Sequence, residues 1–312
     1  MKKQLFLTLL IMMSITTNSH AHGGNQYEHK DIFQEMKKGD KAAIIGVHFG
    51  TTHEDTRIKT IDAVNSLLKQ EFKVHKADFF EAYTSRIIIK RLNDRGIKKE
   101  NPEQLLNKLA KEGYTHIIIQ PTTIINGLEM ESLAKNVAQL KHLFKDIRLG
   151  SPLLYSPEDY ENVIQVITKG KGRTKSYVLV GHGTYDPTTA QYAMLDYMLK
   201  AKGYSNFVVG TIEGYPSFDD AVNQLKQIGN KEIVLIPFMF VAGEHAKNDI
   251  AEDWKEALEK EGYRVEAKLE GLGEIQEIQQ LYLDKAKFSI HHKKREILDK
   301  KKVYEVTGEV ME

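Results

Sequence analysis

The chain contains no cysteine among its 312 residues. Disulfides, cysteine-ligated iron–sulfur clusters, thiolate zinc sites and cysteine nucleophiles are therefore excluded together. A metal ion would have to be held by His, Asp, Glu or other oxygen donors, and the twelve histidines make that feasible. An excess of one charge is missing too, since 44 Lys and Arg face 43 Asp and Glu. The composition therefore gives no reason to expect a nucleic-acid partner.

Long apolar runs are also scarce, and the notable one stands at the N-terminus. Lys2 and Lys3 precede an apolar run from Leu5 to Ile15, and Ser19-His20-Ala21 follows as a small-x-small site. This order is typical of a secretory signal peptide, and the run is shorter than the ~20 residues that a membrane-spanning helix needs. We expect cleavage after Ala21 and an exported, periplasmic protein. Removing the two lysines leaves 42 basic against 43 acidic residues, a net charge near −1.

From about Lys41, short β-rich apolar runs alternate with amphipathic stretches of helical period. This alternation is typical of parallel βαβ units, so we predict an α/β fold. The expected strands are 42–49, 73–80, 116–120, 177–180, 206–211, 232–237 and 264–269. The expected helices include 56–70, 85–94, 102–112, 188–202, 218–228 and 249–262.

The two halves of the chain share an internal repeat. Val47-His48-Phe49-Gly50-Thr51 matches Val180-Gly181-His182-Gly183-Thr184. The strand that ends at Pro121, with a glycine six residues later, matches the one that ends at Pro237. Two landmarks in the same order predict two similar lobes, each a parallel sheet flanked by helices, which could face one another across a ligand cleft.

The expected division of the chain follows from this repeat. We predict a signal peptide (1–21), a mature N-terminal extension (22–40), an N-terminal α/β lobe with its crossover (41–174), a C-terminal α/β lobe carrying a metal site (175–284) and a charged, exposed tail (285–312).

Three side chains suited to metal binding follow predicted strands of the second lobe: His182, Glu213 and His245. Ligands of open α/β sheets gather at the carboxyl ends of the strands, where loops leave the sheet. Glycines beside His182 and Glu213 allow the backbone and a ligand to approach closely. Two imidazoles and one carboxylate suit a borderline divalent ion and leave coordination positions open. We therefore predict a metal or acid/base site in this lobe.

The repeat provides a control for this prediction. In the first lobe, Phe49 matches His182, Arg86 lies near the match of Glu213, and Glu129 matches His245. Residues that only maintain the fold would more often be kept in both lobes, so the asymmetry favours a chemical role. The alternative is that the histidines are buried and satisfied by backbone groups.

Other candidates carry less weight. His48 is next to the position that matches His182, but a shift of one residue along a strand turns a side chain to the other face. Glu244 and Asp249 are candidates for orienting an imidazole. The chain has no Walker A motif, no complete dinucleotide fingerprint and no Gly-x-Ser-x-Gly elbow, so we expect no nucleotide cofactor.

Taken together, the motifs of both lobes resemble the sirohydrochlorin cobaltochelatases of anaerobic cobalamin synthesis, from about Lys41 to Lys285. The residues that carry the resemblance are Phe49-Gly50-Thr51, Thr56-Arg57, Lys59 to Ala63, Tyr83 to Arg86, Gln120-Pro121-Thr122, Gly181 to Thr184, Glu213 to Pro216 and Ala242 to Asp249.

The resemblance implies a class II chelatase fold with a tetrapyrrole cleft between two lobes. It also implies that His182, Glu213 and His245 bind the metal and that the two histidines serve catalysis. The export signal, the tail beyond Lys285 and His48 depart from the family pattern. Export in particular calls a role in a cytoplasmic pathway into question.

The expected activity is insertion of Co2+ into sirohydrochlorin or a related tetrapyrrole without ATP. Fe2+, Ni2+ and Zn2+ stay open as metals, and so does a homo-oligomeric state. An exported haem, tetrapyrrole or metal carrier without turnover is the alternative. The macrocycle carries many carboxylates, so cationic groups should line its cleft. Candidates for contact with the substrate are His48, Arg57, Lys59, Arg86, Lys90 and Lys247.

Overall fold

The computed structural model describes residues 26–243 and 246–308, and the side chains of 246 and 247 are not part of the description. The chain divides into a main unit, Lys30–His292, and a second unit formed by the residues before and after it. The predicted signal peptide lies outside the described residues. No helix in the described part of the chain has both the length and the apolar character that crossing a bilayer requires.

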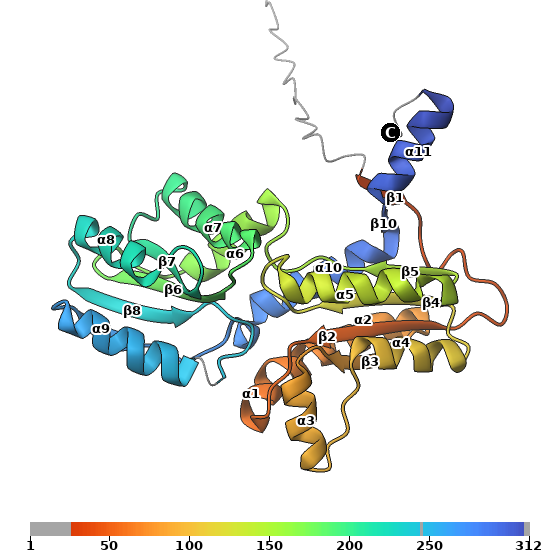
Figure 1. Ribbon diagram of the computed structural model, residues 1–312, viewed down its shortest axis with the longest axis horizontal. Helices are drawn as coiled ribbons and strands as arrows, with labels where there is room; N and C mark the ends of the chain where they lie inside the picture. Colours follow the sequence, from red (N-terminus) through yellow and green to blue (C-terminus); the bar gives the residue numbers. More distant parts are fainter. Residues whose placement is uncertain (1–25, 244–245, 309–312) are drawn as a thin grey trace, which may run out of the picture. The chain divides into compact units, whose positions relative to one another are not determined.

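The main unit contains two four-stranded parallel sheets with the same strand order, and the predicted α/β fold is confirmed (Figure 1). The sheet of the first lobe has the order β3-β2-β4-β5 and that of the second lobe β7-β6-β8-β9. The strands are β2 (Ala42–His48), β3 (Asp78–Tyr83), β4 (His116–Pro121), β5 (Asp146–Leu149), β6 (Ser176–Gly183), β7 (Phe207–Glu213), β8 (Glu232–Pro237) and β9 (Arg264–Ala267).

The register of the strands agrees with the internal repeat. Val47 pairs with Pro121 in the first sheet, and Val180 pairs with Pro237 in the second. The residue after each proline donates its backbone N–H to the matching valine, from Thr122 at 2.9 Å and from Phe238 at 2.7 Å. The two lobes are thus equivalent residue by residue at the ends of their central strands.

Helices connect the strands and cover both faces of each sheet. Several begin at a capping box: Asn101, Ser156 and Ser217 each form one with the residue three positions later. The α-helices are α1 (Glu54–Lys59), α2 (Ile61–Phe72), α3 (Arg86–Asp94), α4 (Pro102–Lys111), α5 (Leu128–Leu140), α6 (Pro157–Thr168), α7 (Ala190–Ala201), α8 (Phe218–Ile228), α9 (Lys255–Lys260), α10 (Gln276–His291) and α11 (Ile297–Thr307). Short helical segments are η2 (Lys73–His75), η3 (Lys141–Leu143), η4 (Pro187–Thr189), η5 (Ala246–Trp254, of π type) and η6 (Leu272–Glu274).

Three clusters of buried apolar side chains hold these layers together, and one of them spans both lobes. The shared cluster packs α2 and α10 on the first sheet, through Ile44 and Ile118, and α6 and α7 on the second, through Leu179 and Val209. The outer faces have separate cores, with α4 and α5 on the first sheet and α8, η5 and α9 on the second. Alternate strand residues thus serve different cores, as the period of two requires.

Helix α10 extends past the boundary that we predicted at Lys285. Ala286, Ser289 and Ile290 are buried, and the helix packs on α2 and β4 of the first lobe. The Lys285 ammonium is itself buried and lies 2.5 Å from the Asp159 carboxylate at the start of α6. The prediction of an exposed tail from 285 was therefore wrong up to His291, because the polar residues of α10 find partners inside the protein.

The expected strand 73–80 was also displaced. Residues 73–75 form η2, and Lys76 then adopts a left-handed conformation with φ of 55°, so that β3 starts only at Asp78. Val74 is exposed, which shows that its β-branched side chain gave a misleading strand signal. The edge strand β5 was not among the expected strands.

The second unit pairs the two ends of the described chain. Strand β1 (Tyr27–His29) pairs with β10 (His292–Lys294), and Arg295 donates its backbone N–H to the Gln26 carbonyl at 2.8 Å. Helix α11 follows and buries none of its described side chains. None of the residues 293–308 is buried, so this described part agrees with the exposed tail that the sequence predicts over a longer range.

Candidate active site

His182 and Glu213 lie at the carboxyl ends of adjacent strands. Strand β6 is buried from Val178 to Gly181, and His182 follows as a half-buried residue. Strand β7 ends at Glu213, which is exposed and pairs in register with Gly183. The structure thus brings two of the three predicted metal ligands to one edge of the second sheet, where α/β proteins bind their ligands.

Two glycines allow the strand ends to approach this closely. Gly183 has φ of +79°, and a Cβ on it would stand 1.7 Å from the Glu213 carbonyl oxygen. Gly214 has φ of +84°, and a Cβ there would stand 2.2 Å from the Thr184 carbonyl oxygen. Any larger residue would push the two strand ends apart, so these glycines fix the separation of the backbones that carry His182 and Glu213.

Hydrogen bonds hold the loop after Glu213 in place. Thr189 Oγ1 donates to the Tyr215 carbonyl at 2.8 Å and accepts from the Tyr215 N–H at 3.0 Å. Thr211 donates both its N–H and its hydroxyl to the Pro216 carbonyl, each at 2.8 Å. Helix α8 then begins after the Ser217 cap. Glu213 therefore stands on a well-supported turn.

The third predicted ligand, His245, lies outside the described residues, as does Glu244. The chain on either side is described: buried Phe238 to Phe240 lead toward it, and η5 begins at Ala246. Helices of π type often occur at functional sites. In the described part of the chain, which lacks the His245 side chain, no three His, Cys, Asp or Glu residues are grouped to hold a metal ion.

His48 is placed in the interior rather than toward a substrate. Its side chain is 1% exposed, and its ring nitrogens lie 2.9 Å from Thr122 Oγ1 and 2.8 Å from Asn65 Oδ1. Burial lowers the pKa of His48, because the imidazolium form would lose its hydration. With both nitrogens engaged and no exposed surface, this residue is withdrawn as a candidate for direct substrate contact.

The predicted cationic candidates differ in availability. Arg57 is paired with Asp62 at 3.1 Å, Lys59 lies 3.7 Å from Glu274, and Lys90 is paired with Asp94 at 2.9 Å. Arg86 is exposed at the start of α3 and forms no ion pair with another described side chain. The Lys247 side chain lies outside the description. Arg86 is thus the most available of the described cationic candidates for an anionic ligand.

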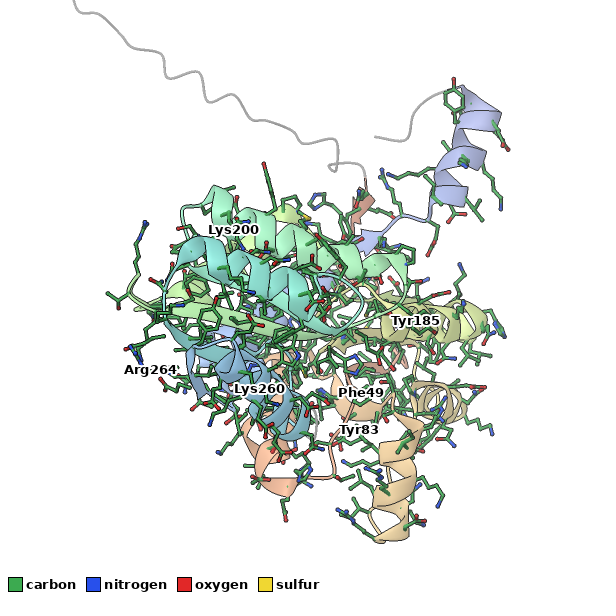
Figure 2. The ribbon with its side chains drawn as sticks, turned by 60° about the vertical axis from the view of Figure 1, so that its left-hand side comes forward. Phe49, Tyr83, Tyr185, Lys200, Lys260 and Arg264 are labelled. Carbon is green, nitrogen blue, oxygen red and sulfur yellow. The ribbon has the colours of Figure 1, made fainter. Side chains whose placement is uncertain are left out.

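Exposed aromatic rings near the strand ends were not among the candidates from sequence. Phe49 follows β2 and is 52% exposed, and Tyr185 follows β6 and is 83% exposed (Figure 2). Tyr215 follows β7 and is 54% exposed. A large apolar ring just beyond a buried strand is the signal that would have found them. Flat rings of this kind favour stacking with a flat ligand.

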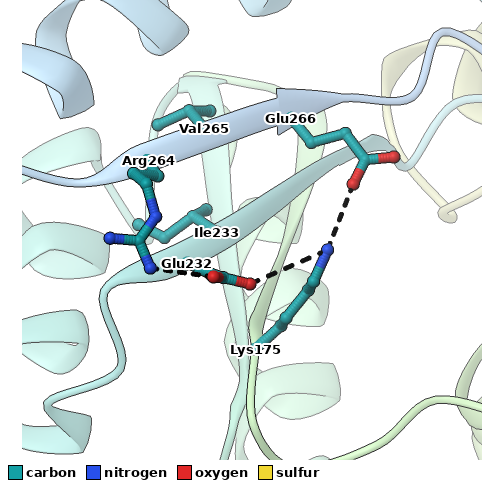
Figure 3. Close-up of a pocket in the computed structure, with 6 residues that line it drawn as sticks. All are labelled: Lys175, Glu232, Ile233, Arg264, Val265 and Glu266. Carbon is teal, nitrogen blue, oxygen red and sulfur yellow. Dashed lines mark hydrogen bonds and ion pairs between the residues drawn. The ribbon is translucent and has the colours of Figure 1, made fainter.

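A recess lies at the opposite, amino ends of the strands of the second sheet (Figure 3). There Glu232 accepts from Arg264 at 2.8 Å, and the Lys175 ammonium lies 3.4 Å from Glu266 and 3.9 Å from Glu232. The charges compensate one another. This recess therefore shows no feature that calls for a ligand, and it is separate from the edge that carries His182 and Glu213.

Comparison with known proteins finds similar sequences over most of the chain. The chain is 37% identical over 251 residues to the sirohydrochlorin cobaltochelatase of Salmonella typhimurium, covering 78% of this chain and 94% of that protein. It is 30% identical over 213 residues to the sirohydrochlorin cobaltochelatase CbiKC of Nitratidesulfovibrio vulgaris, covering 65% and 75% respectively.

Solved structures share the fold. SirB from Bacillus subtilis with Fe3+ superposes with a TM-score of 0.56 at 14% identity, covering 80% of this chain and 96% of that one. The model of the cobalt chelatase (CbiK) family matches residues 41–291, from the start of the first sheet to the end of α10. The chain therefore belongs to the cobalt chelatase (CbiK) family.

Proposed function

We propose that this protein is a sirohydrochlorin cobaltochelatase, which inserts a divalent metal ion into sirohydrochlorin. The observation that carries this function is the 37% identity to an enzyme of that name over 94% of its length. The match includes both lobes and the edge that carries His182 and Glu213. Membership of an enzyme family favours turnover over a carrier that binds stoichiometrically.

We assign His182, Glu213 and His245 as the groups that present the metal. Two imidazoles and a carboxylate would replace part of the hydration shell and leave positions open toward the macrocycle. His182 and Glu213 stand on adjacent, glycine-spaced strand ends. Fixed backbone positions for these two ligands would limit the reorganisation required when the metal is handed over.

Metal insertion exchanges the ligands of the ion for four pyrrole nitrogens while two N–H protons leave. A flat macrocycle presents its lone pairs poorly, so a cleft that binds the ring in a distorted form would lower the barrier. We assign proton acceptance to His182 and His245, which must be neutral to bind the metal and are suited to receive a proton as the ion departs. The reaction needs no nucleotide.

Recognition of the macrocycle requires cations for its peripheral carboxylates. Arg86 is exposed and unpaired among the described ion pairs, and a guanidinium binds carboxylate with two parallel hydrogen bonds. Arg57, Lys59, Lys90 and Lys247 remain secondary candidates. We propose Co2+ as the metal because the relatives are cobaltochelatases; the donor set itself also suits Fe2+, Ni2+ and Zn2+.

We further propose that the protein is exported and acts in the periplasm. The support is the order of Lys2-Lys3, the apolar run and the Ala21 site. Expression of the full chain followed by N-terminal sequencing of the mature form tests this. A mature protein that begins at His22 in a periplasmic extract supports export, and a chain that keeps residue 2 in the cytoplasm contradicts it.

The activity is tested by anaerobic absorbance spectroscopy of the mature protein with excess sirohydrochlorin and Co2+. The expected result is many turnovers per chain, lost when His182→Ala and His245→Ala are combined. A signal that stops at one macrocycle per chain would contradict the enzyme and indicate the carrier. Repeating the assay with Fe2+, Ni2+ and Zn2+ ranks the metals.

A further inference from the structure

Helix α7 presents an apolar face to solvent. It runs along the outside of the second lobe (Figure 1), and its four exposed residues are all apolar: Ala190, Met194, Tyr197 and Ala201. Met194 is 38% exposed and Tyr197 is 73% exposed. Successive members of this set are four, three and four residues apart, which places them in one line along the helix. We call this line the α7 stripe.

The inner side of α7 is apolar as well. Tyr192, Leu195 and Leu199 are buried in the apolar cluster shared by both lobes. A surface helix normally turns polar residues outward, and a helix that is apolar all round is normally covered all round. The outer face of α7 therefore calls for a partner.

The charged side chains of α7 are used within the chain and do not interrupt the stripe. Asp196 accepts from the Val209 N–H at 2.9 Å and from the Gln224 amide at 3.2 Å. Asp196 also pairs with Lys200. The two charges of the helix thus compensate one another, and the stripe itself is uncharged.

Comparable helices of the same chain do not share this feature. Helix α8, which also packs on β7, exposes only polar residues: Asp219, Asn223, Lys226 and Gln227. Helix α2, which covers the sheet of the first lobe, exposes Ser66, Lys69 and Gln70. An apolar outer face is therefore a property of α7 and not of the fold.

The α7 stripe is complementary to itself when its direction is reversed. Read from either end, it runs small, large, large, small with the same spacing. Antiparallel contact between two copies would set Ala190 against the partner's Ala201 and Met194 against the partner's Tyr197. The alanines would let the helix ends approach closely, and a thioether beside an aromatic ring is a favourable contact. This pattern points to a second copy of the chain as the partner.

The charges beside the stripe favour the same partner. Ala193 and Lys200 are seven residues apart and so lie on one flank of the stripe. Reversal brings Lys200 beside the partner's Ala193, so like charges do not meet across the contact. A charged partner, in contrast, would find no opposite charge on the stripe.

We propose that the protein forms a twofold homodimer in which the α7 stripe packs antiparallel on the same stripe of a second copy. Such a contact uses one surface on both subunits, as closed dimers do. It does not depend on the proposed function, because neither the metal nor the macrocycle takes part in it.

Sedimentation velocity of the mature protein over a wide range of concentration measures the dimer. We expect a reversible monomer–dimer equilibrium, since a contact through one helix is smaller than a standard interface. Tyr197→Lys should weaken dimerisation about 100-fold, because it removes a central ring twice per dimer and brings two ammonium groups to the contact. The matched control is Tyr304→Lys, the same change at a ring of α11 that is 56% exposed. It should leave the equilibrium unchanged, and both variants should keep the melting temperature.

Cysteine variants test the antiparallel order, since the natural chain has no cysteine. Ala190→Cys and Ala201→Cys are made separately. The two positions are about 16 Å apart along the helix, beyond the ~7 Å that a disulfide spans between Cα atoms. Under mild oxidation, a mixture of the two variants should give linked dimers, while either variant alone should stay largely unlinked.

Several results would overturn the inference. They are a monomer at every concentration, unchanged dimerisation in Tyr197→Lys, an equal loss in Tyr304→Lys, and linkage of each cysteine variant with itself in preference to the mixture. A monomer that co-sediments with phosphatidylglycerol vesicles through Tyr197 would overturn it too, and would indicate a lipid surface as the partner. Absence of chelatase turnover would refute the proposed function alone.

Discussion

The two lobes share a backbone but differ in chemistry at one edge. Gly50-Thr51 and Gly183-Thr184 follow the matching central strands, and each threonine hydroxyl accepts from the N–H two residues later, at 3.1 Å and 3.2 Å. Just before these pairs stand Phe49 in the first lobe and His182 in the second. The residues that shape the turn are repeated and the residue that could bind a metal is not, which separates the demands of the fold from those of the reaction.

The adjacent strand shows the same contrast. Register places Ser85 of the first lobe where the second has Glu213, since Gly50 and Gly183 occupy matching positions. Ser85 caps α3 by accepting from the Ile88 N–H, so its role is to start a helix. The first lobe therefore carries a phenyl ring and a helix cap at the two sites where the second carries an imidazole and a carboxylate.

The largest effect on turnover is expected when the second lobe is given the residue that the first lobe has at the position of His182. His182→Phe installs the residue of the first lobe and should lower chelatase turnover by about 100-fold or more, near 2.7 kcal/mol of barrier, because a phenyl ring cannot bind the metal. The converse Phe49→His should create no second metal site, since Ser85 replaces the carboxylate. Steady-state assays with Co2+ measure both. Retained turnover in His182→Phe would remove this residue from the metal site.

A second prediction concerns the helix that joins the lobes. Lys285→Met should lower the free energy of unfolding by about 2 kcal/mol, because it leaves the Asp159 carboxylate half-buried without its charged partner. Urea titration measures this. The control is Lys287→Met, which breaks the more exposed pair with Glu71 and should cost no more than about 0.5 kcal/mol. Equal costs would show that burial of the pair does not matter.

A third prediction distinguishes the metal-binding role proposed for Glu213 from the helix-capping role of Ser85. Glu213→Gln should weaken Co2+ binding about tenfold, or 1.4 kcal/mol, by removing the negative charge while keeping the shape. Ser85→Ala at the matching position should leave Co2+ affinity unchanged but destabilise the fold by about 1 kcal/mol, the usual cost of a lost helix cap. Calorimetry and thermal unfolding of both variants give the four values. A Glu213→Gln protein with full affinity would refute the carboxylate ligand.

The smallest expected effect is a pH dependence of stability that comes from His48, whose matching position in the second lobe is Gly181. Burial lowers the pKa of His48 below its usual 6.5; nearby Glu81 and Asp62 oppose this shift, and Lys99 adds to it. The unfolded chain takes up a proton as the pH falls through 6.5 and the native chain does not. Stability is therefore full above pH 6.5 and is lost below it, by less than about 1.4 kcal/mol per pH unit.

Thermal unfolding between pH 7.5 and 5.5 measures this dependence, and His48→Gln should flatten it. Some slope should remain, because burial also lowers the pKa of His116. An unchanged slope in His48→Gln would show that this imidazole is not the titrating group.

The comparison of lobes also explains what the sequence could reveal. The repeat and the strand-end positions of His182 and Glu213 follow from local pattern, because the carboxyl ends of parallel strands lie at one edge. The burial of His48 does not follow from local pattern, because its partners Asn65, Thr122 and Phe240 are distant in sequence. The alternation of residues along a strand does not reveal that a loop of the second lobe places the Phe240 ring against the His48 imidazole.

Helix α10 shows a second limit of the sequence pattern. Its Gln279 and Lys285 suggest an exposed surface, yet the Gln279 amide donates to the Gly273 carbonyl at 2.7 Å and Lys285 pairs with Asp159. Polar residues are found inside proteins when tertiary partners satisfy them. Those partners lie elsewhere in the chain, so no local window could have placed this helix in the core.

The position of α10 has a consequence for the order of events during synthesis. The first lobe begins near residue 41, but one face of its sheet is completed only by a helix near residue 280. A ribosome must therefore make almost the whole chain before the lobe that emerged first can close its core. An incomplete chain would have α2 on that face but would lack the packing of α10 on β4, a state that fits the proposed export, in which a chain is threaded through a translocation channel before it folds.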